Sequence, residues 1–156
     1  MHPLKERKSF LKGFKDAFSG IYTVLKNEKN FRVHICMMIY VLVFSAVGKV
    51  GISNFLKFLI CFACVFTAEL INSAIERVCD RISEEYDEKI GSIKDISAGA
   101  VLVSAIFSAI LGLCVFLSKE VLISIWETFV SYPIVPVIIF LSLPVSVLFI
   151  VKRGNK

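Results

Sequence analysis

The chain has 156 residues, of which 56% are hydrophobic and 20% are charged, with a formal net charge of +5. The apolar fraction is well above that of an ordinary soluble domain, which excludes a typical soluble enzyme, and the length suits one small unit. We therefore predict an all-α integral membrane protein, a small helical bundle without a nucleic-acid partner.

Residues 8–29 are predicted to form an amphipathic surface helix. Its apolar face carries Phe10, Phe14, Ala17, Phe18, Ile21, Tyr22 and Leu25, and lysines gather on the opposite face. Such a helix is too charged to span a bilayer and should lie in the cytoplasmic interface. It either anchors the chain or also lines a functional site, and Glu28 at its end favours the second role.

Three core membrane spans are predicted at about 33–50, 55–82 and 96–117. A short turn at Gly48–Asn54 makes the first two spans antiparallel neighbours, and the third is rich in small residues that permit close helix contacts. Residues 119–156 are predicted to add an amphipathic segment and a fourth span at about 134–151, in which Pro144 should produce a kink.

The basic residues are distributed unevenly along the chain. Fifteen of the eighteen Lys and Arg residues lie before Val33, between Arg77 and Lys94, or after Val151. The positive-inside rule therefore places the N-terminus, the connection between the second and third spans, and the C-terminus in the cytoplasm.

The second span contains a polar stripe. Phe58 to Ala68 carries no charge, yet the residues that follow place several polar side chains within about 100° of helical arc: Glu69, Asn72, Ser73, Glu76 and Asp80. Ionisable residues at membrane depth usually face a bundle interior and mark a functional site. The stripe runs toward the cytoplasm, so it could join a membrane-embedded reactant to a water-soluble nucleotide.

The familiar phosphate-binding signatures GxxxxGK[ST] and GxGxxG do not occur in the sequence. Mg²⁺ is typically held by one or two carboxylates together with substrate phosphates, and Glu28 and Glu76 can provide them. Glu69, which lies deeper, could accept a proton from a lipid hydroxyl. The polar loop at 80–95 is either a solvated connection or a nucleotide-binding loop, with Lys94 for phosphate and Tyr86 for stacking.

The runs FRVH and AELINSAIERVCDRISEEYDEKIGSIKDISAGAVL, with the spacing from Glu28 to Glu69 and Glu76, resemble the prokaryotic diacylglycerol kinase and undecaprenol kinase family. The likeness covers roughly Phe10 to Leu117, so residues 1–118 are expected to form a membrane lipid kinase domain. It implies transfer of the γ-phosphate of MgATP to a membrane lipid alcohol, with Mg²⁺ as cofactor. It also implies a homotrimer with shared active sites that face the cytoplasm, in the plasma membrane of a bacterium.

The resemblance also implies roles for individual residues. Glu69 looks like the catalytic base that contacts the lipid substrate, and Asn72 looks like its polar support. Glu28 and Glu76 look like the metal and nucleotide ligands. The remaining nucleotide-binding positions would be Glu85, Tyr86, Asp87, Lys94 and Asp95.

Two features depart from the general pattern. His34 in FRVH resembles the Gram-positive undecaprenol kinase branch, which favours undecaprenol over diacylglycerol as the substrate. Nothing in the resemblance explains the tail after Ser118, and we expect residues 119–156 to be dispensable for the chemistry. From the residues alone two other functions stay open, a proton-coupled transporter with Glu69 as a relay and a non-catalytic adaptor whose stripe joins helices.

Overall fold

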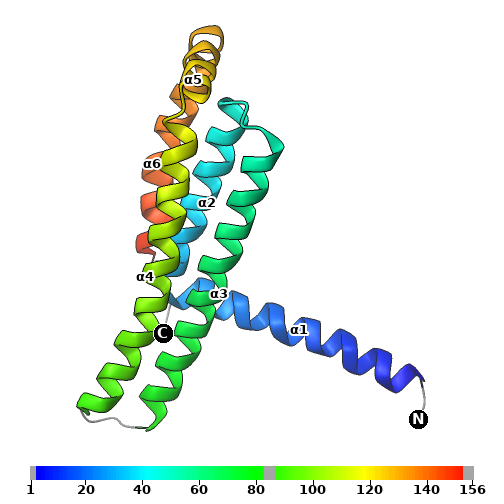
Figure 1. Cartoon of the computed structure of the whole chain (residues 1–156). Helices are drawn as coiled ribbons and strands as arrows, with labels where there is room; N and C mark the ends of the chain where they lie inside the picture. Colours follow the sequence, from blue (N-terminus) through cyan, green and yellow to red (C-terminus); the bar gives the residue numbers. More distant parts are fainter. Residues whose placement is uncertain (1–2, 83–86, 153–156) are drawn as a thin grey trace.

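The structure is a computed structural model that describes residues 3–82 and 87–152. In these ranges the chain is all-helical, as predicted, with the helices α1 (Pro3–Asn27), α2 (Lys29–Val47), α3 (Ile52–Ile82), α4 (Glu88–Phe116), α5 (Lys119–Ser131) and α6 (Ile134–Val151) (Figure 1). Four of the described helices, α2, α3, α4 and α6, are long and apolar enough to cross a membrane.

The region 80–95, predicted as a loop, is mostly helical. α3 ends at Ile82, as predicted for the second span, but α4 already begins at Glu88, so the prediction of a long polar loop is wrong. The reason is local capping, because Asp87 Oδ1 accepts hydrogen bonds from the backbone N–H groups of Lys89 (2.8 Å) and Ile90 (3.4 Å). Much of this polar stretch therefore forms the ends of two helices.

α1 leaves the bundle at a steep angle, as Figure 1 shows. Its aromatic residues Phe10, Phe14, Phe18 and Tyr22 are exposed, as expected for a helix that lies in a membrane interface. The helix ends at Asn27, and Glu28 adopts an extended conformation (φ −96°, ψ 117°) that turns the chain into α2. Glu28 is therefore the corner between the surface helix and the first span.

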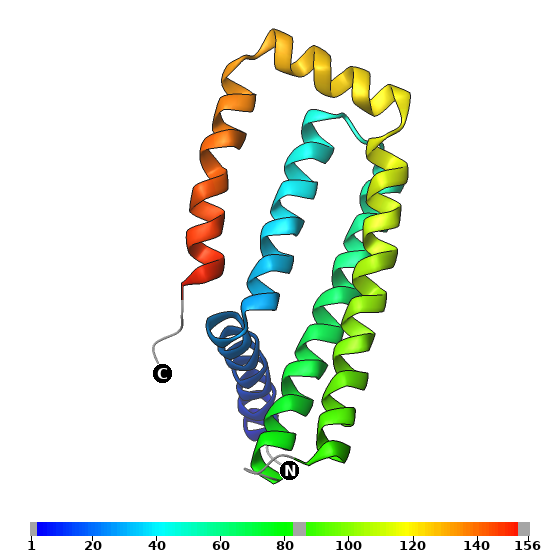
Figure 2. The same cartoon turned by 90° about the vertical axis from the view of Figure 1, so that its left-hand side faces the viewer.

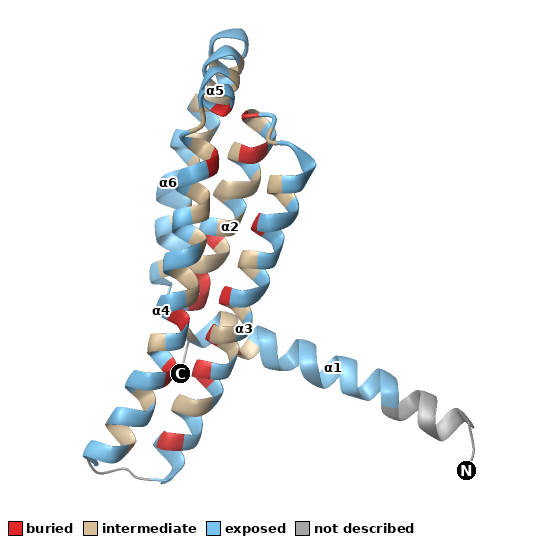
Figure 3. Cartoon of the chain, viewed as in Figure 1, coloured by how far each residue is buried: buried red, intermediate tan, exposed pale blue. Residues whose placement is uncertain are grey.

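The core lies between α2, α3 and α4. α3 and α4 pack against each other along much of their length, and buried residues gather on the facing sides of these helices (Figures 2 and 3). Phe58 on α3 stacks on Phe116 at a ring separation of 5.4 Å, and Phe44 on α2 meets the same ring edge-on at 6.4 Å. Aromatic contacts of this kind join all three helices toward the ends of α2 and α4.

α5 and α6 pack chiefly on α2. α5 lies across one end of the bundle, so close to the turn after α2 that a Cβ on Gly48 would lie 2.8 Å from Val121 Cγ1 (Figure 2). α6 then runs back beside α2, where Tyr40 Oη lies 3.0 Å from Ser142 Oγ and 2.9 Å from Ser146 Oγ. No residue of α6 is buried, so most of its surface is available to lipid.

Candidate active site

Glu69 is a buried carboxyl group with an unpaired oxygen. Its relative exposure is 2%, and within the described residues Oε2 has no hydrogen-bond partner. Ser73, one turn further along α3, is equally buried. An unpaired buried polar group is costly, and a native protein that keeps one usually has a functional reason. The polar stripe predicted for the second span thus includes a buried carboxyl group.

A chain of hydrogen bonds connects α3 with α4 beside this carboxyl group. Asn72 Nδ2 donates to Glu76 Oε1 at 2.9 Å, and Ser97 Oγ donates to Asn72 Oδ1 at 2.6 Å. A carboxylate can only accept, so the Asn72 amide nitrogen must face Glu76 and its carbonyl oxygen must face Ser97. Glu76 therefore fixes which way Asn72 presents its donor, and the Ser97 hydroxyl, which also lies 2.9 Å from the Lys94 carbonyl oxygen, meets the Asn72 carbonyl oxygen.

Glu28 contacts the same region of α3 from the corner between α1 and α2. Arg77 Nη2 lies 3.6 Å from Glu28 Oε1, and both side chains are partly exposed. A pair with this exposure adds little to stability. The contact does place Glu28 beside Arg77, the residue that follows Glu76 in α3.

Of the remaining predicted nucleotide-binding residues, those that the structure describes lie at the start of α4. Lys94 forms an ion pair with Asp80, and Asp95 beside it is exposed. Asp87 caps the start of α4, about 15 Å along the helix from Ser97 at 1.5 Å per residue. Glu85 and Tyr86 lie outside the described residues.

Contacts therefore connect some of the site residues that the sequence predicted. Asn72 and Glu76 are linked directly, and Glu28 reaches the same part of α3 through Arg77. Two connecting residues, Arg77 and Ser97, were missed as site residues, although Ser97 follows Lys94 by three residues and so shares its helix face.

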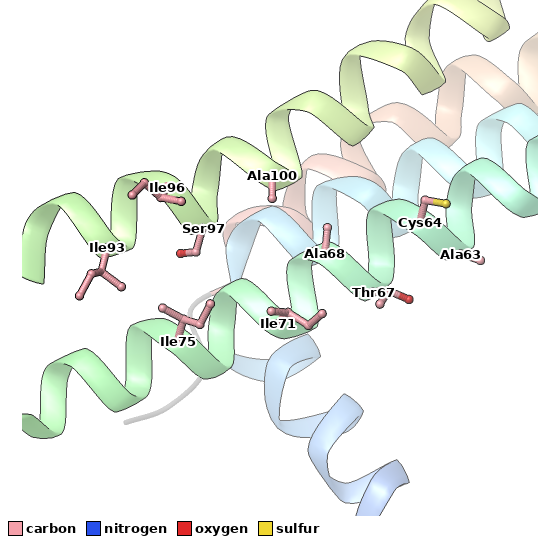
Figure 4. A pocket seen from close by; sticks show the side chains of 10 residues that line it. All are labelled: Ala63, Cys64, Thr67, Ala68, Ile71, Ile75, Ile93, Ile96, Ser97 and Ala100. Atoms are coloured by element: carbon pink, nitrogen blue, oxygen red, sulfur yellow. The ribbon is translucent and has the colours of Figure 1, made fainter.

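A pocket of about 740 Å³ lies between α3 and α4, on the surface that Figure 4 shows. Ile71 and Ile75 from α3 face Ile93 and Ile96 from α4, and Ser97 points toward α3. Ser97 is also the residue that bonds Asn72. An apolar surface thus reaches the edge of the polar chain.

The protein groups fit a magnesium ion bound jointly with phosphates. Within the described ranges no cluster of three or more His, Cys, Asp or Glu side chains gathers into a metal cage. Magnesium does not require one, since it usually takes one or two carboxylates together with substrate phosphates and water. Glu28, paired with Arg77, and Glu76, bonded to Asn72, are carboxylates of the kind that magnesium takes.

Comparison with known proteins gives the family. Residues 15–116 match the family described as prokaryotic diacylglycerol kinase, and the chain belongs to it. The match spans α2, α3 and α4 and the second half of α1, and it ends before α5.

Named relatives agree with this membership. The chain is 33% identical to the undecaprenol kinase of Bacillus subtilis over 73% of its length and 93% of that protein. It is 29% identical to a diacylglycerol kinase of Synechocystis over 70% of its length and 63% of the relative. A shorter stretch, 34% of this chain and 43% of the relative, is 47% identical to the diacylglycerol kinase of Escherichia coli. No solved structure matches the chain.

The chain is thus a bacterial lipid kinase and a multi-pass protein of the plasma membrane. As a kinase it takes a nucleotide as one substrate and a lipid as the other.

Proposed function

We propose that this protein transfers the γ-phosphate of MgATP to the hydroxyl of undecaprenol. The observation that carries the proposal is Glu69, a buried carboxyl group with an unpaired oxygen that follows the uncharged run Phe58 to Ala68. A group of this kind can accept a proton from a lipid alcohol at a depth where water is scarce. Neither a passive adaptor nor a surface anchor needs it beside Asn72 and Glu76.

The reaction needs few protein groups. The lipid hydroxyl oxygen forms a bond to the γ-phosphorus, the bond from that phosphorus to the bridging oxygen of ADP breaks, and the hydroxyl proton passes to Glu69. Asn72, held between Glu76 and Ser97, keeps the adjacent polar surface in one orientation. Positioning and charge neutralisation account for most catalysis of phosphoryl transfer, so this small set is sufficient.

Glu28 and Glu76 are the proposed metal and nucleotide ligands. When bound, Mg²⁺ neutralises phosphate charge. Arg77 restrains one oxygen of Glu28, and Asn72 restrains one oxygen of Glu76. Glu28 and Glu76 would be the protein carboxylates that hold the metal. Lys94 and Asp95 are proposed to contact the phosphates, and Glu85, Tyr86 and Asp87 to contact the rest of the nucleotide.

The choice of undecaprenol as the substrate rests on sequence similarity to named relatives. The Bacillus subtilis relative, named undecaprenol kinase, is matched over 93% of its length, whereas the Escherichia coli diacylglycerol kinase is matched over 43%. His34 in the FRVH run agrees with the same branch. Diacylglycerol is the alternative acceptor, because its hydroxyl makes the same demand on Glu69.

We also propose a homotrimer whose active sites lie at the borders between subunits and face the cytoplasm. The distribution of Lys and Arg supports this orientation. Glu28 contacts α3 of its own chain through Arg77. The two proposed metal ligands, Glu28 and Glu76, would therefore come from the same subunit.

A direct assay tests the substrate. Purified full-length protein is given labelled ATP with undecaprenol or with diacylglycerol, in micelles of one composition, and kcat/KM is measured for each lipid. We expect undecaprenol to be preferred by at least about tenfold, a difference of about 1.4 kcal/mol in transition-state binding. A preference for diacylglycerol would replace the proposed substrate, and turnover of neither lipid would overturn the kinase assignment.

A further inference from the structure

Arg32 is a buried cation that joins the ends of two helices. Its side chain is 6% exposed. Nη1 donates to the carbonyls of Leu25 (3.1 Å) and Lys26 (2.9 Å) in the last turn of α1. Nε donates to the carbonyl of Ile150 (3.2 Å) in the last turn of α6, 118 residues further along the chain.

Helix dipoles explain how this charge is tolerated. In the described residues the ion pairs involve Arg77 and Lys94, so Arg32 is held by backbone carbonyls. The C-terminus of a helix carries roughly half an elementary negative charge, so α1 and α6 together supply about one charge to balance the guanidinium. α6 contributes about half of that compensation and covers the side chain as well.

Arg32 also lies close to Glu28 along the backbone. Its N–H donates to the Glu28 carbonyl at 3.4 Å, within the first turn of α2, while its side chain holds the last turn of α1. The residue thus restrains the chain on both sides of the corner that Glu28 forms. A displacement of Arg32 would change the angle of that corner.

We propose that Arg32 is a positioning residue through which the fourth span sets the place of Glu28 and, with it, the affinity for MgATP. The inference rests on the proposed function, in which Glu28 is a metal and nucleotide ligand. Ile150 lies outside the family match at 15–116, so this restraint comes from the added helices. α6 carries no ionisable side chain, and its contribution is a backbone carbonyl at the end of a helix.

The test changes one carbonyl in the full-length chain. Val151→Pro disfavours the helical conformation of Ile150 and so turns its carbonyl away from Arg32, while every charge of the tail is kept. The matched control is Val151→Ala, which stays helical and alters an exposed side chain. A second control, Tyr40→Phe, removes the hydroxyl that contacts Ser142 and Ser146, so it weakens packing between α2 and α6 without touching Arg32.

Steady-state kinetics give the first readout. Val151→Pro should raise the KM for MgATP about tenfold, the loss expected for one hydrogen bond to a charged group, with kcat and the lipid KM within roughly twofold. Val151→Ala and Tyr40→Phe should leave the KM for MgATP unchanged. Arg32→Gln should raise the KM for MgATP at least as much as Val151→Pro does. The double variant should have the same KM as Arg32→Gln alone, because the coupling passes through Arg32.

Amide hydrogen exchange gives a readout that does not depend on catalysis. Val151→Pro should speed exchange of the Glu28 N–H, which donates to the Val24 carbonyl at 2.7 Å, by about tenfold, and should leave the amides around Tyr40 unchanged. If the wild-type protein phosphorylates no lipid, the proposed function fails. Hydrogen exchange at the Glu28 N–H would still show whether the end of α6 is coupled to Glu28. Arg32→Lys replaces Arg32→Gln if the latter does not fold, since one ammonium group lacks the fork that reaches both helices.

Two results would overturn the inference. One is an equal KM for MgATP in Val151→Pro and Val151→Ala together with unchanged exchange at Glu28. The other is an additive effect of Val151→Pro and Arg32→Gln, which would mean that the end of α6 acts by a route other than Arg32.

Discussion

Ser97→Ala is expected to reduce activity through Asn72, although Ser97 itself need not touch either substrate. The substitution removes the hydroxyl that lies 2.6 Å from Asn72 Oδ1, and Asn72 is 6% exposed. A buried acceptor left without a donor costs about 1–3 kcal/mol. If that cost appears as misorientation of Asn72 in the transition state, kcat/KM falls by about 5- to 150-fold.

The assay compares three variants of α4 in the full-length protein, with labelled ATP and undecaprenol as substrates. Ser97→Thr keeps the hydroxyl and should retain most of the activity. Ser104→Ala is the matched control, because its hydroxyl donates to the Ala100 carbonyl of the same helix and contacts no site residue. The reasoning is refuted if Ser97→Ala stays within roughly twofold of wild type, or if Ser104→Ala loses as much activity.

Three further predictions concern the carboxylates and the added helices. Glu69→Gln should fold and lose about 10²–10⁴ in rate, and a variant that kept more than about half of wild-type turnover would show that Glu69 is not the base. Glu28→Ala and Glu76→Ala should each raise the KM for MgATP, and mixing the two variants should restore no activity, because Glu28 contacts α3 of its own chain. Recovery in mixed oligomers would instead place the two carboxylates in different subunits. A chain that ends at Ser118 should still insert and phosphorylate lipid, with a higher KM for MgATP because Arg32 loses Ile150; a folded but inactive protein would contradict this.

Local patterns in the sequence determined the helices and their polar stripe. In lipid each spanning helix must satisfy its own backbone hydrogen bonds, so long apolar runs specify helices directly. The helical period then places Glu69, Asn72 and Glu76 near one another, because all three belong to one helix. Glu28 was found by its place at the end of the amphipathic segment and by the family resemblance. The match of residues 15–116 to the family confirms that resemblance.

The prediction from the sequence was wrong where helix capping outweighs the loop-like composition. The region 80–95 is rich in charge, which is typical of a loop, yet Asp87 begins α4 by accepting hydrogen bonds from two backbone N–H groups. This cap stabilises the first turn of a helix inside an apparent loop. α4 consequently begins at Glu88, before the predicted third span, whereas α3 ends at Ile82 as predicted.

The short turn at Gly48–Asn54 predicts that α2 and α3 are neighbours, but only the tertiary structure decided the other helix pairs. Ser97 meets Asn72 across 25 residues of sequence, and Arg32 meets Ile150 across 118. The period of one helix says which residues share a face, but it does not say which other helix covers that face. The side chains that orient Asn72 and restrain Glu28 therefore emerge from packing, while the sequence by itself determines the carboxylates that they position.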